Sequence, residues 1–114
     1  MSYPKMASLL KKLMEKTDAV QLKWEEGSKK ATFRVSFPEY TILLSIRPCA
    51  DSPEDDYYIS IFNSEGTLIE ETSDRELATF IPNAYQQMQS LYDKARRQAL
   101  GVDKAIDNIL ENLK

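Results

Sequence analysis

The chain has 114 residues, a net charge of −3, one cysteine and no histidine. A chain of this length can build one hydrophobic core, so we expect residues 1–114 to form a single domain. Without histidine there is no imidazole base, no Ser-His or Cys-His pair and no common His-containing zinc site. A hydrophobic fraction of 42% and a charged fraction of 29% are typical of folded soluble proteins and argue against disorder.

Location and redox compartment are indicated only indirectly. No apolar run approaches the roughly 20 residues that a membrane span needs, and the first residues lead into an amphipathic segment rather than a signal-peptide region. The single Cys49 cannot form an intramolecular disulfide, which suits a reducing compartment. We therefore expect a cytoplasmic protein that does not contact a membrane.

Charge is divided unevenly along the chain. Residues 1–47 carry nine Lys and Arg against five Asp and Glu, a net charge of +4, whereas residues 48–114 carry six against thirteen, a net charge of −7. This division could guide head-to-tail association of copies, or it could be averaged out where the two halves fold against each other.

The first predicted element is a helix that begins near Pro4. Its apolar residues recur with helical spacing, and lysines occupy the other side. The apolar set is Met6, Leu9, Leu10, Leu13 and Met14. Because the helix is short and its apolar side has no aromatic anchor, we expect it to pack on the protein's own sheet rather than on a membrane.

A β-hairpin is predicted next, with a two-residue type II′ turn at Gly27-Ser28 that places Glu26 opposite Lys29. The same register places Trp24 opposite Ala31, Leu22 opposite Phe33 and Val20 opposite Val35. All apolar partners then share one face, which supports the register.

A third strand follows a tight connection at Pro38-Glu39. Its register places Phe37 opposite Tyr40, Val35 opposite Ile42 and Phe33 opposite Leu44. Residues 57–62 form a fourth strand, and a type I turn with a left-handed Gly66 returns the chain as a fifth strand at residues 67–71. The five strands form an antiparallel meander.

Helices are predicted for the rest of the chain. Ser73 to Glu76 is a capping box, and one apolar helical face runs from residue 77 to about residue 95. Pro82 should bend that helix or split it into a short turn and a main helix. Leu100-Gly101 ends it, and a second apolar stripe follows. That stripe is Val102, Ala105, Ile106, Ile109, Leu110 and Leu113.

The overall prediction is an α+β fold: an N-terminal helix, a five-stranded antiparallel meander sheet, and C-terminal helices packed on one face. We expect those helices to cover one set of strand residues. The set is Val20, Leu22, Trp24, Phe33, Val35, Ile42, Leu44, Ile59 and Ile61.

Residues 91–107 (LYDKARRQALGVDKAID) resemble the C-terminal signature of an uncharacterised family of small bacterial proteins. The leading helix, the hairpin around Trp24 and the turn at Gly66 are also similar to that family over nearly the whole chain. The resemblance implies a bacterial, intracellular origin and one domain. It implies no catalytic or binding residue.

The sequence gives little support for a metal, thiol or catalytic site. Asp51, Glu54, Asp55 and Asp56 could supply oxygen ligands to calcium or magnesium, but they lack EF-hand spacing, so we expect a solvated loop and no metal. We expect Cys49 to be unreactive, because only Arg47 lies near it in sequence. No pattern predicts a catalytic residue, a nucleotide cofactor or an enzyme.

Lys94, Arg96 and Arg97 lie near a predicted helix C-terminus, where cations interact favourably with the helix dipole. That role is sufficient to explain them. Phosphate binding is the alternative.

The second face of the sheet carries the strongest functional pattern. Alternation collects there Lys23, Arg34, Leu43, Arg47, Tyr58, Phe62 and Leu68. An antiparallel sheet that faces water should be mainly polar on that side. The apolar residues of this set therefore predict that another helix or another protein covers them. The N-terminal or final helix could cover this face, or a protein partner, a second copy included, could bind there.

We therefore expect a non-catalytic protein-interaction or adaptor module that binds a protein partner or forms a homodimer through this face. The alternative is single-stranded nucleic-acid binding by Lys23, Arg34, Arg47, Tyr58 and Phe62, because basic and aromatic side chains on a sheet can hold single strands. A pI near 5.0 disfavours that alternative.

Overall fold

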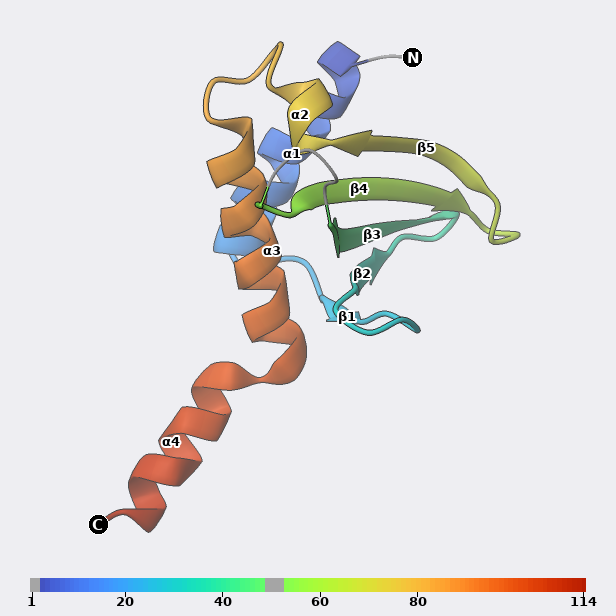
Figure 1. Ribbon diagram of the computed structural model, residues 1–114. Helices are drawn as coiled ribbons and strands as arrows, with labels where there is room; N and C mark the ends of the chain where they lie inside the picture. The colour runs from blue at the N-terminus through green and yellow to red at the C-terminus, as the bar shows by residue number, and fades with distance from the viewer. Residues whose placement is uncertain (1–2, 49–52) are drawn as a thin grey trace.

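The computed structural model of the chain describes residues 3–48 and 53–114. Its helices are α1 (Tyr3–Asp18), α2 (Asp74–Leu77), α3 (Ala84–Leu100) and α4 (Val102–Asn112). Its strands are β1 (Glu25–Glu26), β2 (Phe33–Ser36), β3 (Tyr40–Arg47), β4 (Asp56–Asn63) and β5 (Leu68–Ser73). The strands form one antiparallel sheet in the order β1-β2-β3-β4-β5 (Figure 1). The predicted α+β class and the five-stranded meander are confirmed.

One face of the sheet, here called the inner face, is covered by α1, α2 and α3 (Figure 1). Its buried strand residues are Phe33, Val35, Ile42, Leu44 and Ile59. Trp24 is also buried, and Leu22 and Ile61 lie partly buried at the edge of the core. Alternation of apolar and polar residues along β2, β3 and β4 explains this face, because successive side chains in a strand point to opposite sides.

Helix α1 buries Met6, Leu10 and Leu13, which lie on one side of the helix as predicted. The helix packs chiefly against α3 and α2. The expectation that it packs on the sheet is therefore only partly met: its buried residues join the same core as the strand residues, but its main contacts are with the two other helices.

The first hairpin differs from the prediction. Glu26 lies opposite Phe33 rather than Lys29, so β1 is short and residues 27–32 form a loop. The Gly27 N–H closes this loop on the Thr32 carbonyl at 2.8 Å. Val20 lies before the strand and is 74% exposed, so its predicted core position is wrong. The reason is that α1 extends to Asp18 and the chain must reverse before a strand can start.

The remaining strand pairs are those predicted. Phe33 lies opposite Leu44 and Val35 opposite Ile42, and the Phe37 N–H donates to the Tyr40 carbonyl at 2.7 Å across the Pro38-Glu39 turn. These contacts confirm the register of β2 with β3.

The β4–β5 turn is also as predicted. Gly66 has a φ of +81°, and its N–H donates to the Asn63 carbonyl at 3.0 Å. The register then shifts at a bulge, so that Phe62 lies opposite Leu68 while Ile61 lies opposite Glu70. The bulge leaves Ile69 half-exposed.

Pro82 splits the C-terminal helix rather than bending it. Ser73 Oγ accepts the Glu76 N–H at 3.3 Å, which confirms the predicted cap and starts α2. The chain then turns through Asn83, which has a left-handed φ of 63°, and α3 begins at Ala84. The split lets α2 and α3 cover different parts of the inner face.

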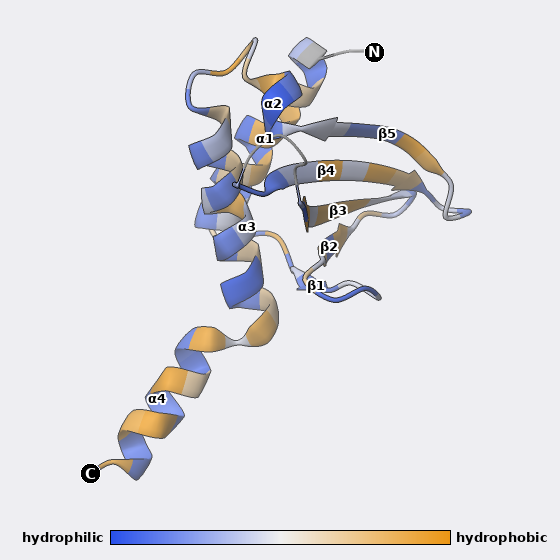
Figure 2. Ribbon diagram, in the orientation of Figure 1, coloured by the Kyte–Doolittle hydropathy of each residue, from blue (hydrophilic) through white to orange (hydrophobic). Residues whose placement is uncertain are grey.

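Helix α4 does not join this packing. It leaves α3 at Gly101, which has a φ of 62°, and projects away from the sheet (Figure 1). None of its residues is buried, and its apolar and polar residues alternate along the exposed ribbon (Figure 2). The expectation that the C-terminal helices pack on the sheet thus holds for α2 and α3 and not for α4.

Candidate interaction face

The opposite side of the sheet, here called the outer face, brings together Arg34, Leu43, Arg47, Tyr58, Phe62 and Leu68. The register shows this directly: Arg34 lies opposite Leu43 on β3, and Phe62 on β4 lies opposite Leu68 on β5. Leu43 and Phe62 alternate with the buried Leu44 and the partly buried Ile61, so they point away from the inner face. Six of the seven predicted residues therefore share one surface.

Lys23 is the exception. It lies in the segment between α1 and β1 and lines a shallow pocket with Val20, Trp24 and Gln98 near the end of α3. Its predicted place on the outer face is wrong, because that placement assumed a strand running back to Val20.

Two adjoining grooves cross the outer face, with volumes of 580 and 510 Å³. They share Ser28, Leu43 and Phe62. Strands and turns line both grooves, and no described helix contributes a lining residue. The expectation that the N-terminal or final helix covers this face is therefore wrong, since α1 belongs to the inner layer and α4 projects away.

The loop of residues 27–32 forms one wall of the larger groove. Gly27 is required there, because a Cβ at this position would overlap Thr32 Oγ1 and lie 3.1 Å from Leu43 Cδ1. Thr32 Oγ1 donates to the Lys29 carbonyl at 2.6 Å, and Tyr92 Oη of α3 donates to the Ala31 carbonyl at 2.7 Å. These bonds hold Lys29 and Lys30 at the edge of the groove.

Arg47 and Glu71 form a two-pronged ion pair across β4. Arg47 Nη1 lies 2.9 Å from Glu71 Oε1, and Arg47 Nη2 lies 2.6 Å from Glu71 Oε2. Ser60 Oγ donates to the same carboxylate at 2.6 Å, and the guanidinium lies 4.1 Å from the centre of the Tyr58 ring. Hydrogen bonding by Arg47 lowers the pKa of Glu71, and hydrogen bonding to Glu71 raises the pKa of Arg47.

Three other cations border the outer face. Lys29, Lys30 and Arg34 form no ion pair with any carboxylate among residues 3–48 and 53–114. Since Arg47 is neutralised by Glu71, Lys29 and Lys30 give the larger groove a positive border. In the smaller groove Arg34 is accompanied by the carboxylate of Glu39.

One polar group on this face is also unsatisfied. Ser45, opposite Tyr58 in the sheet, is 7% exposed, and its Oγ has no hydrogen-bond partner among the described atoms. Buried hydroxyls normally have a hydrogen-bond partner, so the unpaired hydroxyl of Ser45 lowers the stability of the protein when the outer face is free.

The other candidate cations form ion pairs within the protein. Lys94 pairs with Asp18 at 2.5 Å, Arg96 with Asp93 at 2.8 Å, and Arg97 with Asp103 at 2.6 Å. Each of these three cations is therefore paired with a carboxylate, which gives the phosphate alternative no support.

The acidic candidates do not converge either. Asp56 pairs with Arg75 at 3.0 Å. No group of three metal-ligand side chains occurs in the described part of the chain. Asp51 and Cys49 lie outside the described residues.

Two features were not predicted from the sequence: the wall that residues 27–32 form on the outer face, and the absence of a cover on the apolar side of α4. Gly27 followed by Lys29 and Lys30 was the signal for the first, but it fitted a tight turn equally well. The stripe on α4 was visible, yet a helical pattern does not show which surface covers it.

No helix within the described ranges is both long enough and apolar enough to span a membrane. Comparison with protein-family models, with curated protein sequences and with solved structures found no match. Function must therefore be inferred from the surface chemistry of this chain.

Proposed function

We propose that this protein is a non-catalytic interaction module that binds a protein partner through the outer face. The observation that carries the proposal is an apolar groove floor left uncovered by any described helix. Leu68 is 47% exposed, and Leu43 and Phe62 are only partly buried. Apolar surface of this kind, bordered by charge, is typical of protein-binding sites.

The shape of the surface supports a macromolecular partner. The two grooves adjoin and are open, and their floor extends toward Phe37 and Tyr40 at the β2–β3 turn. Phe37 is 40% and Tyr40 46% exposed. Aromatic and aliphatic groups spread over several strands suit a protein surface better than a small ligand, which is usually enclosed on most sides.

Single-stranded nucleic-acid binding receives less support. The Tyr58 ring is already covered by the Arg47 guanidinium, so that face is not available for a base. Arg47 is also paired with Glu71 on this surface, so its charge is already used within the protein and is not free for a phosphate.

A photo-crosslinking experiment tests the proposal. p-Benzoylphenylalanine is introduced at Leu68 on the outer face, and at the exposed Lys11 of α1 as a matched control. We expect a discrete crosslinked protein from position 68, and none from position 11. No product at 68, or the same products at both positions, would contradict the proposal.

The nucleic-acid alternative is tested by titrating labelled single-stranded oligonucleotides at two salt concentrations. Binding that collapses with added salt, and that the Arg34→Glu substitution abolishes, would favour the alternative. No binding at low salt would remove it.

A further inference from the structure

Helix α4 presents an apolar side that its own chain leaves uncovered. Ile106, Ile109, Leu110 and Leu113 are 44%, 56%, 59% and 75% exposed. The helix has only 11 residues. Isolated helices shorter than roughly 12–15 residues are marginal in water and gain most of their stability from packing an apolar side. This helix therefore needs a surface to pack on.

One row of polar residues along α4 is acidic. Asp103, Asp107 and Glu111 follow at intervals of four residues and so form one row along the helix. Arg97 pairs with Asp103 and Lys114 pairs with Glu111 at 3.1 Å, so Asp107 is the acidic side chain of this row that has no ion pair within the described residues. A matching surface should combine an apolar floor with unpaired cations.

The outer face has that combination. Its floor is Leu43, Phe62 and Leu68, and Lys29 and Lys30 border the larger groove. Helix α4 is about 16 Å long at 1.5 Å per residue. The first and fifth strands of a five-stranded sheet lie about 19 Å apart, at roughly 4.8 Å between neighbouring strands. The helix is thus short enough to lie across the sheet, both surfaces are apolar, and the charges beside them are opposite in sign.

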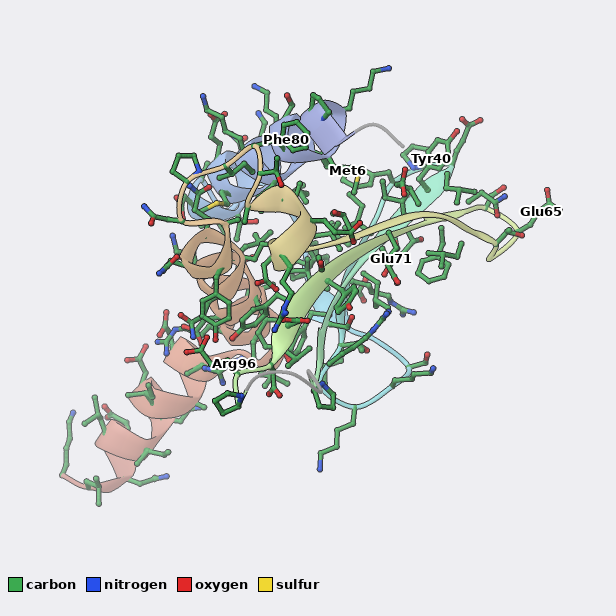
Figure 3. All side chains as sticks on the ribbon, turned by 45° about the horizontal axis from the view of Figure 1, so that its top comes forward. Met6, Tyr40, Glu65, Glu71, Phe80 and Arg96 are labelled. Carbon is green, nitrogen blue, oxygen red and sulfur yellow. The ribbon has the colours of Figure 1, made fainter. Side chains whose placement is uncertain are left out.

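The chain's own α4 cannot make this contact in the observed arrangement. It leaves the end of α3, which packs on the inner face, and the Arg97–Asp103 ion pair spans the corner between the two helices. In Figure 3, Tyr40 and Glu65 mark the end of the sheet opposite to α4. The outer face that receives α4 must then belong to another copy.

We propose that α4 of one copy docks on the outer face of a second copy, so that the protein associates with itself. This inference rests on the proposed function of the outer face and names its partner. The uneven charge of the chain favours it, because residues 1–47 carry a net +4 and residues 48–114 a net −7. Each copy offers both surfaces, so two copies can make the contact twice.

Sedimentation velocity of the purified full chain over a concentration series tests the proposal. We expect a concentration-dependent dimer that weakens with added salt. The Lys29→Glu/Lys30→Glu chain and the Asp107→Lys/Glu111→Lys chain should each dimerise at least tenfold more weakly. A chain with all four substitutions should recover association, because the charges are complementary again.

An apolar pair of variants checks the same contact. Ile109→Ser/Leu110→Ser on α4 and Leu68→Ser on β5 should each reduce dimerisation at least tenfold, whereas Lys11→Ser on α1 should not change it. Circular dichroism and the emission of Trp24 confirm that each variant is folded. All these positions are exposed, so the fold should tolerate the changes.

The outcomes separate this inference from the proposed function. If α4 substitutions break the dimer and outer-face substitutions do not, α4 pairs with another α4 and the inference is wrong. If the chain is monomeric at every concentration, the inference is also wrong. In both cases a crosslinked partner of different mass at position 68 would still support the proposed function.

Discussion

The indole Nε1 of Trp24 donates a hydrogen bond to Thr17 Oγ1 at 3.0 Å, joining the segment before β1 to the last turn of α1. Both side chains are almost fully buried, at 3% and 1% exposure. This contact fixes where the chain reverses after the first helix, and so determines which residues can pair in β1.

Replacing Thr17 by valine should destabilise the protein by about 1–3 kcal/mol, because the buried indole N–H loses its acceptor. Urea unfolding followed by the emission of Trp24, the only tryptophan, measures the change. Thr17→Ser keeps the hydroxyl and should cost less. A Thr17→Val protein as stable as the wild type would show that the bond contributes nothing.

Replacing Val20 by glycine should stabilise the protein by about 1 kcal/mol. Val20 has a φ of 55°, a strained conformation for a β-branched residue, at the end of α1. Its N–H donates to the Thr17 carbonyl at 3.0 Å, and the Gln21 N–H donates to the Lys16 carbonyl at 2.9 Å, which is a Schellman cap that favours glycine.

Thermal unfolding measures this effect, with Val20→Ala as the control. Alanine relieves the branching but keeps the Cβ, so its gain should be smaller than that of glycine. A lower melting temperature for Val20→Gly than for wild type would contradict the strain assigned to this position.

Stability should depend on pH through Glu71. Because hydrogen bonding to Arg47 lowers the pKa of Glu71 below its ordinary value of 4.5, the folded state favours the charged carboxylate. This contribution is fully present above pH 4.5 and is lost as the pH falls through the folded-state pKa.

Urea unfolding of the wild type and Glu71→Gln at several pH values measures that contribution. The variant should be less stable at pH 7, and the difference should shrink in acid. Arg47→Gln should give the same pattern, since the lowered pKa depends on the guanidinium. A difference that stays constant with pH would contradict this role of the pair.

Tyr92→Phe should destabilise the protein by about 1 kcal/mol and loosen the loop of residues 27–32. Burial raises the pKa of Tyr92, so its hydroxyl stays protonated and donates to the Ala31 carbonyl. Hydrogen exchange of the Gly27 amide, which closes the loop, should become faster.

The control is Tyr85→Phe on the same helix, whose ring packs against Tyr57 and whose hydroxyl has no hydrogen bond within the described residues. It should leave the Gly27 amide unchanged. Equal exchange in Tyr92→Phe and wild type would mean that the loop is held by other contacts.

The elements that depend on short-range order can be predicted from the order of the amino acids alone. Alternation along residues 33–62 separated the inner residues from the outer ones, since side chains of a strand change face at each step. Gly66 and the Ser73 cap determined where the β4–β5 turn and α2 occur, because both rest on hydrogen bonds within a few residues. Six outer-face residues could be predicted for this reason.

Other features depend on contacts between parts of the chain that are distant in sequence. The register of β1 depends on contacts of residues far apart in sequence, such as Tyr92 with Ala31, and a two-residue edge strand carries too little alternation to fix its own pairing. The apolar stripe of α4 predicted a helix but not its surroundings. A helical period specifies which side is apolar, and only the direction taken at Gly101 showed that the chain leaves that side uncovered.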